Sequence, residues 1–133
     1  MVAHRANTLA IELAREAGIA AVGVSDSSHC GAIGLYSRAA AAQGLIGIAF
    51  THSDSIAAPF GGHQAFFGTN PISLAFPRAG DEPLCLDMAT TAIPWNRVMN
   101  ARRDGVALPS GVAVDAQGRD CVDAEEVLSL IHI

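Results

Sequence analysis

The stretch AAVGVSDSSHCGAIGLYSRAAAAQGLIGIAFTHSD, residues 20–54, decides the fold that we expect for this chain. The apolar run over residues 19–24 predicts a short buried strand. The Ala-rich segment over residues 31–43 predicts a helix whose small side chains allow close packing. Residues 45–51 are almost continuously apolar, which predicts a second strand covered on both faces. The stretch therefore predicts strand, loop, helix and strand, with His29 at the turn from strand to helix.

His29 is the first candidate for chemistry because of this place in the predicted unit. In open α/β sheets, ligands bind where strands end and helices begin. A histidine there can donate a proton near neutral pH, and the amides that begin a helix can hold an anionic group beside it. The alternative is a helix-capping turn with a solvated histidine, and the residues alone leave both interpretations open.

The remaining elements are expected from periodicity and from Gly and Pro positions. They follow the chain as a helix over residues 3–17, a long loop over 52–70, strands over 71–77 and 84–87, a helix over 93–103, a loop or hairpin over 111–119, and a short helix over 123–130 capped by Asp123. Loops as long as the one over residues 52–70 are usually functional in compact domains.

Composition narrows the class of protein. A chain of 133 residues, 50% hydrophobic and 16% charged, is expected to be globular and to form one domain. The net charge of −5, with Arg as the basic residue throughout, disfavours nucleic acid as a partner. No apolar run is long enough for a membrane helix, and the start predicts an amphipathic helix instead of a signal peptide. Three dispersed cysteines without a CxxC pair favour reduced thiols in the cytoplasm.

Polar residues after the predicted strands are further candidates. Ser53 and Asp54 follow the second strand, where they can bond a ribose or a substrate hydroxyl, or simply form a turn. The segment from Asp87 to Thr91 ends another strand, where it can hold a phosphate or ribose, or cap the next helix. Glycine turns at residues 61–62 and 68–70 allow close approach of backbone to a ligand, or ordinary hairpins.

Two other chemistries have weaker support. Cys30 beside His29 suggests a thiol nucleophile, but adjacent residues in a turn rarely face each other. A metal site built from His52, Asp54 and His63 matches no compact ligand spacing, so we expect no metal. The GxGxxG fingerprint of the common dinucleotide fold is absent from the chain.

Taken together, the motifs resemble in order and spacing the second type of malate/L-lactate dehydrogenase family, which includes ureidoglycolate dehydrogenase, diketogulonate reductase, sulfolactate dehydrogenase and piperideine-carboxylate reductase. Each motif is weak alone, and the resemblance covers roughly residues 3–108. The motifs are Ser28-His29-Cys30-Gly31-Ala32-Ile33-Gly34, Gln43-Gly44-Leu45-Ile46-Gly47, Thr51-His52-Ser53-Asp54, Pro59-Phe60-Gly61-Gly62, Gly68-Thr69-Asn70-Pro71-Ile72 and Leu86-Asp87-Met88-Ala89-Thr90.

The resemblance implies an α/β fold with a mixed sheet and covering helices, a non-Rossmann NAD(P)-binding fold that is incomplete here. It implies a homodimeric NAD(P)-dependent 2-hydroxyacid dehydrogenase that uses NAD or NADP. Hydride would pass between nicotinamide and a small 2-oxo or 2-hydroxy acid, such as malate, lactate or ureidoglycolate, or a related cyclic imine. His29 would be the catalytic acid and base. The other implied roles are cofactor binding by Ser53, Asp54, Asp87, Met88 and Ala89, and an active-site wall formed by Ser28, Gly68, Thr69 and Asn70.

Family chains are longer at both ends, so we expect this chain to be an internal fragment. Residues 1–120 would form a partial NAD(P)-binding and catalytic domain, and 121–133 an uncertain tail where the resemblance fades. The missing parts would include a substrate-binding Arg and the rest of the cofactor site, so the fragment alone is expected to lose most transition-state stabilisation. The alternative function is a non-catalytic α/β domain that binds a small ligand or another subunit.

Overall fold

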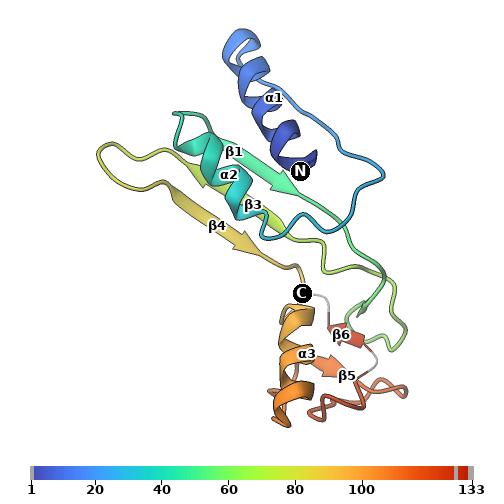
Figure 1. Cartoon of the computed structure of the whole chain (residues 1–133). Helices are drawn as coiled ribbons and strands as arrows, with labels where there is room; N and C mark the ends of the chain where they lie inside the picture. The colour runs from blue at the N-terminus through green and yellow to red at the C-terminus, as the bar shows by residue number, and fades with distance from the viewer. Residues whose placement is uncertain (1, 128, 132–133) are drawn as a thin grey trace. The chain divides into compact units, whose positions relative to one another are not determined.

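The computed structural model of the chain describes residues 2–127 and 129–131, which fall into two compact units (Figure 1). Unit 1 lies within residues 1–50 and 72–87, and unit 2 within residues 51–71 and 88–133. The chain therefore passes between the units at residues 50–51, 71–72 and 87–88. Chain length alone favours a single domain, whereas the contacts divide the chain in two. In the part of the chain that is described, no helix is both long and apolar enough to span a membrane.

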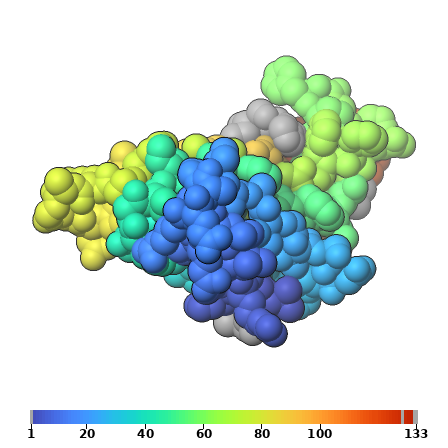
Figure 2. Space-filling view, turned by 90° about the horizontal axis from the view of Figure 1, so that it is seen from above, coloured from blue at the N-terminus to red at the C-terminus, as the bar shows by residue number. Residues whose placement is uncertain are grey.

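Unit 1 contains two helices and a three-stranded sheet. The helices are α1 (Val2–Ala17) and α2 (Gly34–Ala41), and the strands are β1 (Gly47–Phe50), β3 (Ile72–Phe76) and β4 (Leu84–Met88), in the order β1-β3-β4. Strands β1 and β3 are antiparallel, with Ile48 opposite Leu74. Helix α2 packs against β1 and β3, and α1, dark blue in Figure 2, lies beside α2.

Small residues allow α2 to lie directly on the sheet. A Cβ atom added to Gly47 would lie 2.2 Å from the backbone oxygen of Ser37, so only glycine fits there. The buried hydroxyls of Ser37 and Ser73 are 2.6 Å apart, and Ser73 Oγ also donates to the Leu86 carbonyl at 2.6 Å. One pair of hydroxyls thus joins the helix to β3 and β4, and the predicted close packing of this helix is confirmed.

The other face of this sheet is exposed, which corrects the prediction that residues 45–51 are covered on both faces. Along β1 burial alternates, and Ile48 and Phe50 are 60% and 75% exposed. Alternate residues of a strand point to opposite faces, so one side faces α2 and the other faces solvent. A continuous apolar run does not distinguish these two sides, because both carry apolar side chains.

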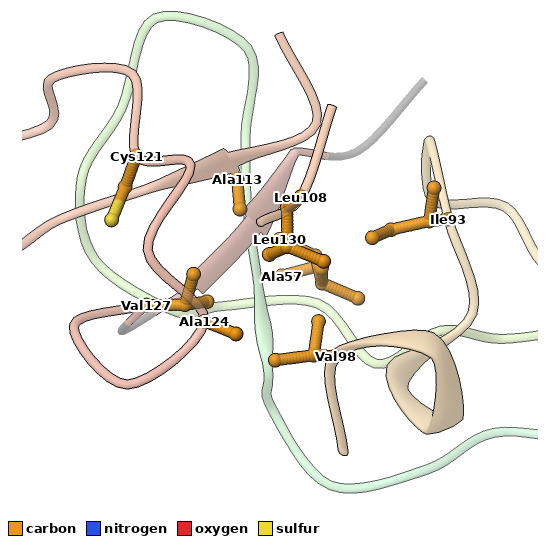
Figure 3. Close-up of a cluster of buried hydrophobic side chains, with 9 residues drawn as sticks. All are labelled: Ala57, Ile93, Val98, Leu108, Ala113, Cys121, Ala124, Val127 and Leu130. Atoms are coloured by element: carbon orange, nitrogen blue, oxygen red, sulfur yellow. The ribbon is translucent and has the colours of Figure 1, made fainter. Parts of the chain in front are cut away.

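Unit 2 contains short strands, one helix and a compact core (Figure 3). Its elements are β2 (Ala57–Ala58), α3 (Trp95–Asp104), β5 (Ala113–Val114) and β6 (Ser129–Ile131), with the strand order β2-β6-β5. Strand β6 is parallel to β2 and antiparallel to β5. The core side chains that converge in Figure 3 are Ala57, Ile93, Val98, Leu108, Ala113, Cys121, Ala124, Val127 and Leu130. Residues beyond 120 therefore supply part of this core.

Most predicted elements are confirmed, with bounds that differ from the predicted ones by up to three residues. The predicted helices over residues 3–17, 31–43 and 93–103 correspond to α1, α2 and α3, and the predicted strands over 45–51, 71–77 and 84–87 correspond to β1, β3 and β4. The alternative of a hairpin over residues 111–119 is also confirmed, because Val114 bridges to Asp120 across a turn.

Two predicted elements are wrong. Residues 19–24 form no strand, and Ile19 is 83% exposed. A strand persists only when a neighbour pairs with its backbone, and within the described residues this segment has no pairing partner. Residues 124–126 form a turn where a helix was predicted, because residues 129–131 pair with β2 and β5 instead. Leu128, within that predicted helix, lies outside the described residues.

We predict that Gly47→Ala lowers the free energy of unfolding by about 2 kcal/mol, the usual cost of overpacking. The new methyl group would collide with backbone, which cannot move aside as a side chain can. Gly23→Ala is the matched control, because nothing lies within 4 Å of its Cβ position. Urea denaturation followed by circular dichroism measures both variants. Equal midpoints for the two would show that α2 does not rest on β1 at this glycine.

Candidate functional site

His29 lies in an irregular loop before α2 and not at the end of a strand. Helix α2 begins at Gly34, so three residues more than predicted separate the histidine from the helix start. The His29 side chain is exposed. The sequence therefore predicts the order of loop, histidine and helix, while the strand that was to position the histidine is absent from the described structure.

The ring of His29 is held by its own loop. The backbone N–H of Gly31 donates to His29 Nδ1 at 2.9 Å. The carbonyl of Cys30 accepts a hydrogen bond from the Tyr36 hydroxyl at 2.7 Å. Tyr36 lies on α2, so the loop that carries the histidine is tied to a helix packed on the sheet. His29 Nε2 has no hydrogen-bond partner among the described residues and is the ring nitrogen available to a ligand.

The side chain of Asp87, a residue of β4, caps the beginning of α2. Its Oδ2 atom accepts the backbone N–H of Gly34 at 2.8 Å, whereas the N-cap residue Ile33 makes no side-chain cap. A carboxylate is favourable here because the first amides of a helix lack partners and carry partial positive charge. The expectation that this helix start holds a ligand anion beside the histidine is thus corrected for Gly34, whose amide already bonds Asp87.

A polar cluster in unit 2 brings together the predicted residues Ser53, Gly68, Thr69 and Asn70. Ser53 Oγ accepts the Thr69 N–H at 3.0 Å and lies 3.3 Å from Thr69 Oγ1. The Ser53 N–H donates to Asn70 Oδ1 at 3.3 Å. Thr90 also contacts this group, since both its N–H and its hydroxyl donate to the Thr69 carbonyl. We call these five residues the polar cluster.

Backbone geometry in the polar cluster is tight. A Cβ atom on Gly68 would lie 2.5 Å from both Asn70 Oδ1 and the Ser53 carbonyl oxygen. Asn70 has φ of 32°, in the left-handed region that Asn tolerates better than most residues. Such constrained conformations gather at functional sites. The Asn70 amide oxygen is used internally, which leaves its NH₂ group as a donor.

The other predicted site residues take less part in these contacts. The Asp54 and Ser28 carbonyl oxygens accept hydrogen bonds from the hydroxyls of the residues before them, Ser53 and Ser27. Met88 and Ala89 lie between Asp87 and Thr90, with Met88 in the last position of β4. Tyr36 is a contributor that the sequence analysis missed, because its role depends on a contact six residues away. Thr90 ends the motif over residues 86–90, but the sequence alone does not indicate its contact with Thr69.

Cys85 is the cysteine of unit 1 with a shifted pKa. Burial raises the pKa of its thiol, and hydrogen bonds with Ser37, Ser73 and Arg38 outweigh burial and lower it below the ordinary value. Its sulfur atom lies 3.7 Å from the hydroxyl oxygens of both Ser37 and Ser73, beneath α2. Among the described residues, no group of three or more His, Cys, Asp and Glu side chains could hold a metal ion.

Comparison with known proteins gives this arrangement a context. The sequence model of the family described as malate/L-lactate dehydrogenase matches residues 1–132. The expectation that the resemblance fades after residue 120 is therefore wrong. The chain is 43% identical over 122 residues to ureidoglycolate dehydrogenase (NAD(+)) from Escherichia coli, covering 92% of this chain and 35% of that protein. It is 38% identical over 120 residues to (2R)-3-sulfolactate dehydrogenase (NADP(+)) from Chromohalobacter salexigens, covering 90% and 36%.

The fold is also found among solved structures. A dehydrogenase from Sinorhizobium meliloti superposes with a TM-score of 0.93 at 34% identity, covering 99% of this chain and 39% of that one. The predicted α/β fold with helices on a sheet is thus confirmed as that of these dehydrogenases. The chain spans 35–38% of the length of the relatives that it matches in sequence. The chain belongs to the malate/L-lactate dehydrogenase family.

Proposed function

We propose that this chain is part of an NAD(P)-dependent oxidoreductase that transfers a hydride between nicotinamide and a 2-oxo or 2-hydroxy acid. The family match and the names of the relatives support this class of reaction. The observation that carries the proposal is that His29 is an exposed residue whose Nδ1 is held, while Nε2 has no partner among the described residues. An exposed histidine whose Nε2 is without a partner can exchange a proton with a bound substrate there.

The side chains of the polar cluster suit part of a nucleotide cofactor in their chemistry. The hydroxyls of Ser53 and Thr69 and the NH₂ group of Asn70 are of the kind that bond ribose and phosphate oxygens. The missing side chain of Gly68 lets backbone approach closely. We propose further cofactor contacts for Asp54, Met88 and Ala89, which lie with the polar cluster in unit 2. For unit 1 we propose that Asp87 contacts the cofactor and that Ser28 belongs to the active-site wall. Since the relatives are named with NAD(+) or NADP(+), the cofactor is one of these two dinucleotides.

The reaction divides its two transfers between cofactor and protein. When bound, the reduced nicotinamide supplies the hydride, which forms the new C–H bond at the carbonyl carbon. As the C=O electron pair moves onto oxygen, that oxygen takes a proton from the His29 imidazolium. The products are the 2-hydroxy acid and the oxidised cofactor. In the reverse direction the neutral ring, with its proton on Nδ1, would accept the hydroxyl proton at Nε2.

We also propose that the protein works as a homodimer in the cytoplasm, and that this chain is part of its cofactor-binding and catalytic domain. Support for the cytoplasm comes from the dispersed cysteines, which form no disulfide. Support for an assembly comes from the apolar face of the β1-β3-β4 sheet, where Ile48, Phe50 and Leu86 are exposed.

The function is tested in a chimera in which this chain replaces the matching segment of the E. coli ureidoglycolate dehydrogenase. We predict that His29→Gln lowers kcat by roughly 10²- to 10⁴-fold, the usual contribution of acid–base catalysis, with NADH affinity unchanged. His4→Gln, an exposed histidine on α1, is the matched control and keeps the parent rate. Full activity of His29→Gln would refute the catalytic role. A folded chimera that binds neither dinucleotide would favour the non-catalytic alternative.

We predict that Gly68→Ala weakens NAD(P)H binding to the same chimera by roughly tenfold, about 1.4 kcal/mol. The added methyl would displace the Asn70 amide and Ser53, which carry the donors of the polar cluster. Gly23→Ala, whose Cβ position is open, should bind as the parent does. Titration of NAD(P)H fluorescence gives both dissociation constants. Parental affinity in a folded Gly68→Ala chimera would place the cofactor away from this cluster.

A further inference from the structure

The peptide unit between Cys30 and Gly31 is held at both ends. Its carbonyl accepts the Tyr36 hydroxyl at 2.7 Å, and its N–H donates to His29 Nδ1 at 2.9 Å. The described backbone contains no cis peptide, and in a planar trans peptide the C=O and N–H point in opposite directions. The tyrosine on one side therefore sets the direction of the N–H that meets the histidine on the other.

The residues around this peptide are built to keep it in place. Gly31 has φ of 83°, a left-handed conformation that favours glycine, and nothing lies within 4 Å of its Cβ position. Glycine is thus required for conformation and not for space. Tyr36 is half-buried on α2, and α2 is fixed by Asp87 at its start and by contact with β1 and β3.

The held peptide determines where the proton of the neutral ring lies. A ring nitrogen that accepts a hydrogen bond carries no proton, so the neutral His29 ring has its proton on Nε2. Nε2 is also the nitrogen of this exposed residue that has no partner among the described residues. In this form the ring can donate a hydrogen bond to a substrate carbonyl oxygen.

We propose that Tyr36 is a positioning residue that, through the Cys30–Gly31 peptide, selects the Nε2–H form of His29. The relevance of this selection to catalysis rests on the proposed function, whereas the selection itself does not. If His29 gives its Nε2 proton completely to the substrate, the ring that remains is neutral only when Nδ1 also carries a proton. A protonated Nδ1 cannot accept the Gly31 N–H, so this hydrogen bond must open during each turnover.

The test is nitrogen NMR of the imidazole in the ¹⁵N-labelled 133-residue chain, at a pH where the ring is neutral. The ring shifts of His29 give the ratio of its Nε2–H and Nδ1–H forms. We expect the Nε2–H form to predominate, and Tyr36→Phe to lower the ratio roughly fivefold, the equilibrium factor of one ordinary hydrogen bond. Thr8→Val is the matched control, since it removes a similar hydroxyl-to-carbonyl bond on α1 and should leave the ratio unchanged.

A predominant Nδ1–H form, or an unchanged ratio in a folded Tyr36→Phe chain, would overturn the proposal. If Tyr36→Phe fails to fold, the unmodified chain still decides. A scalar coupling between the Gly31 amide nitrogen and His29 Nδ1 is expected across their hydrogen bond, and its absence would contradict the held peptide. Failure of the proposed function is distinguishable, because a fully active His29→Gln chimera would remove the catalytic role and leave the tautomer ratio of the chain unaltered.

Discussion

The hydrogen bond from the Gly34 amide to Asp87 Oδ2, 2.8 Å long, joins residues 53 positions apart and determines where α2 begins. The helix has no side-chain cap of its own, so its start depends on a carboxylate from the end of β4. Gly34 makes this approach possible, because a Cβ atom there would lie 2.6 Å from the same carboxylate oxygen. Charge-assisted bonds of this kind are stronger than neutral ones, and this one also meets the positive end of the helix.

Helix α2 packs on the sheet and also holds the loop that carries His29. Its buried Ser37 and its contact with Gly47 hold it on the strands at a distance that larger side chains would prevent. Its Tyr36 reaches the loop and fixes the peptide next to His29. The direction of the imidazole therefore depends on packing several residues away. A helix that shifted on the sheet would move the tyrosine and with it the Gly31 N–H.

The sequence was informative where local signals dominate. Glycines at 18 and 44 and the Pro94 start bounded the helices, and apolar runs located β1, β3 and β4. It failed at residues 19–24, because an apolar run becomes a strand only with a partner, and no local pattern identifies that partner.

The candidate site was predictable to the same extent. Motif order singled out His29 and the residues of the polar cluster, but not the contact of Thr90 with Thr69, which lies 21 positions away. The capping role of Asp87 and the buried hydroxyl of Ser73 depend on contacts between distant segments, which spacing does not encode. Residue type and order thus indicated which residues form the candidate site. The contacts that hold these residues in place became visible only in the folded structure.

Amide hydrogen exchange of Gly34 tests most directly whether Asp87 holds the start of α2. The Gly34 amide should be protected in the parent chain, and Asp87→Ala should speed its exchange roughly tenfold or more, the factor for a hydrogen bond to a charged group. The Gly18 amide, which bonds Ala14 in α1, should be unaffected. Fast exchange of Gly34 in the parent, or the same rate in a folded Asp87→Ala chain, would contradict this account.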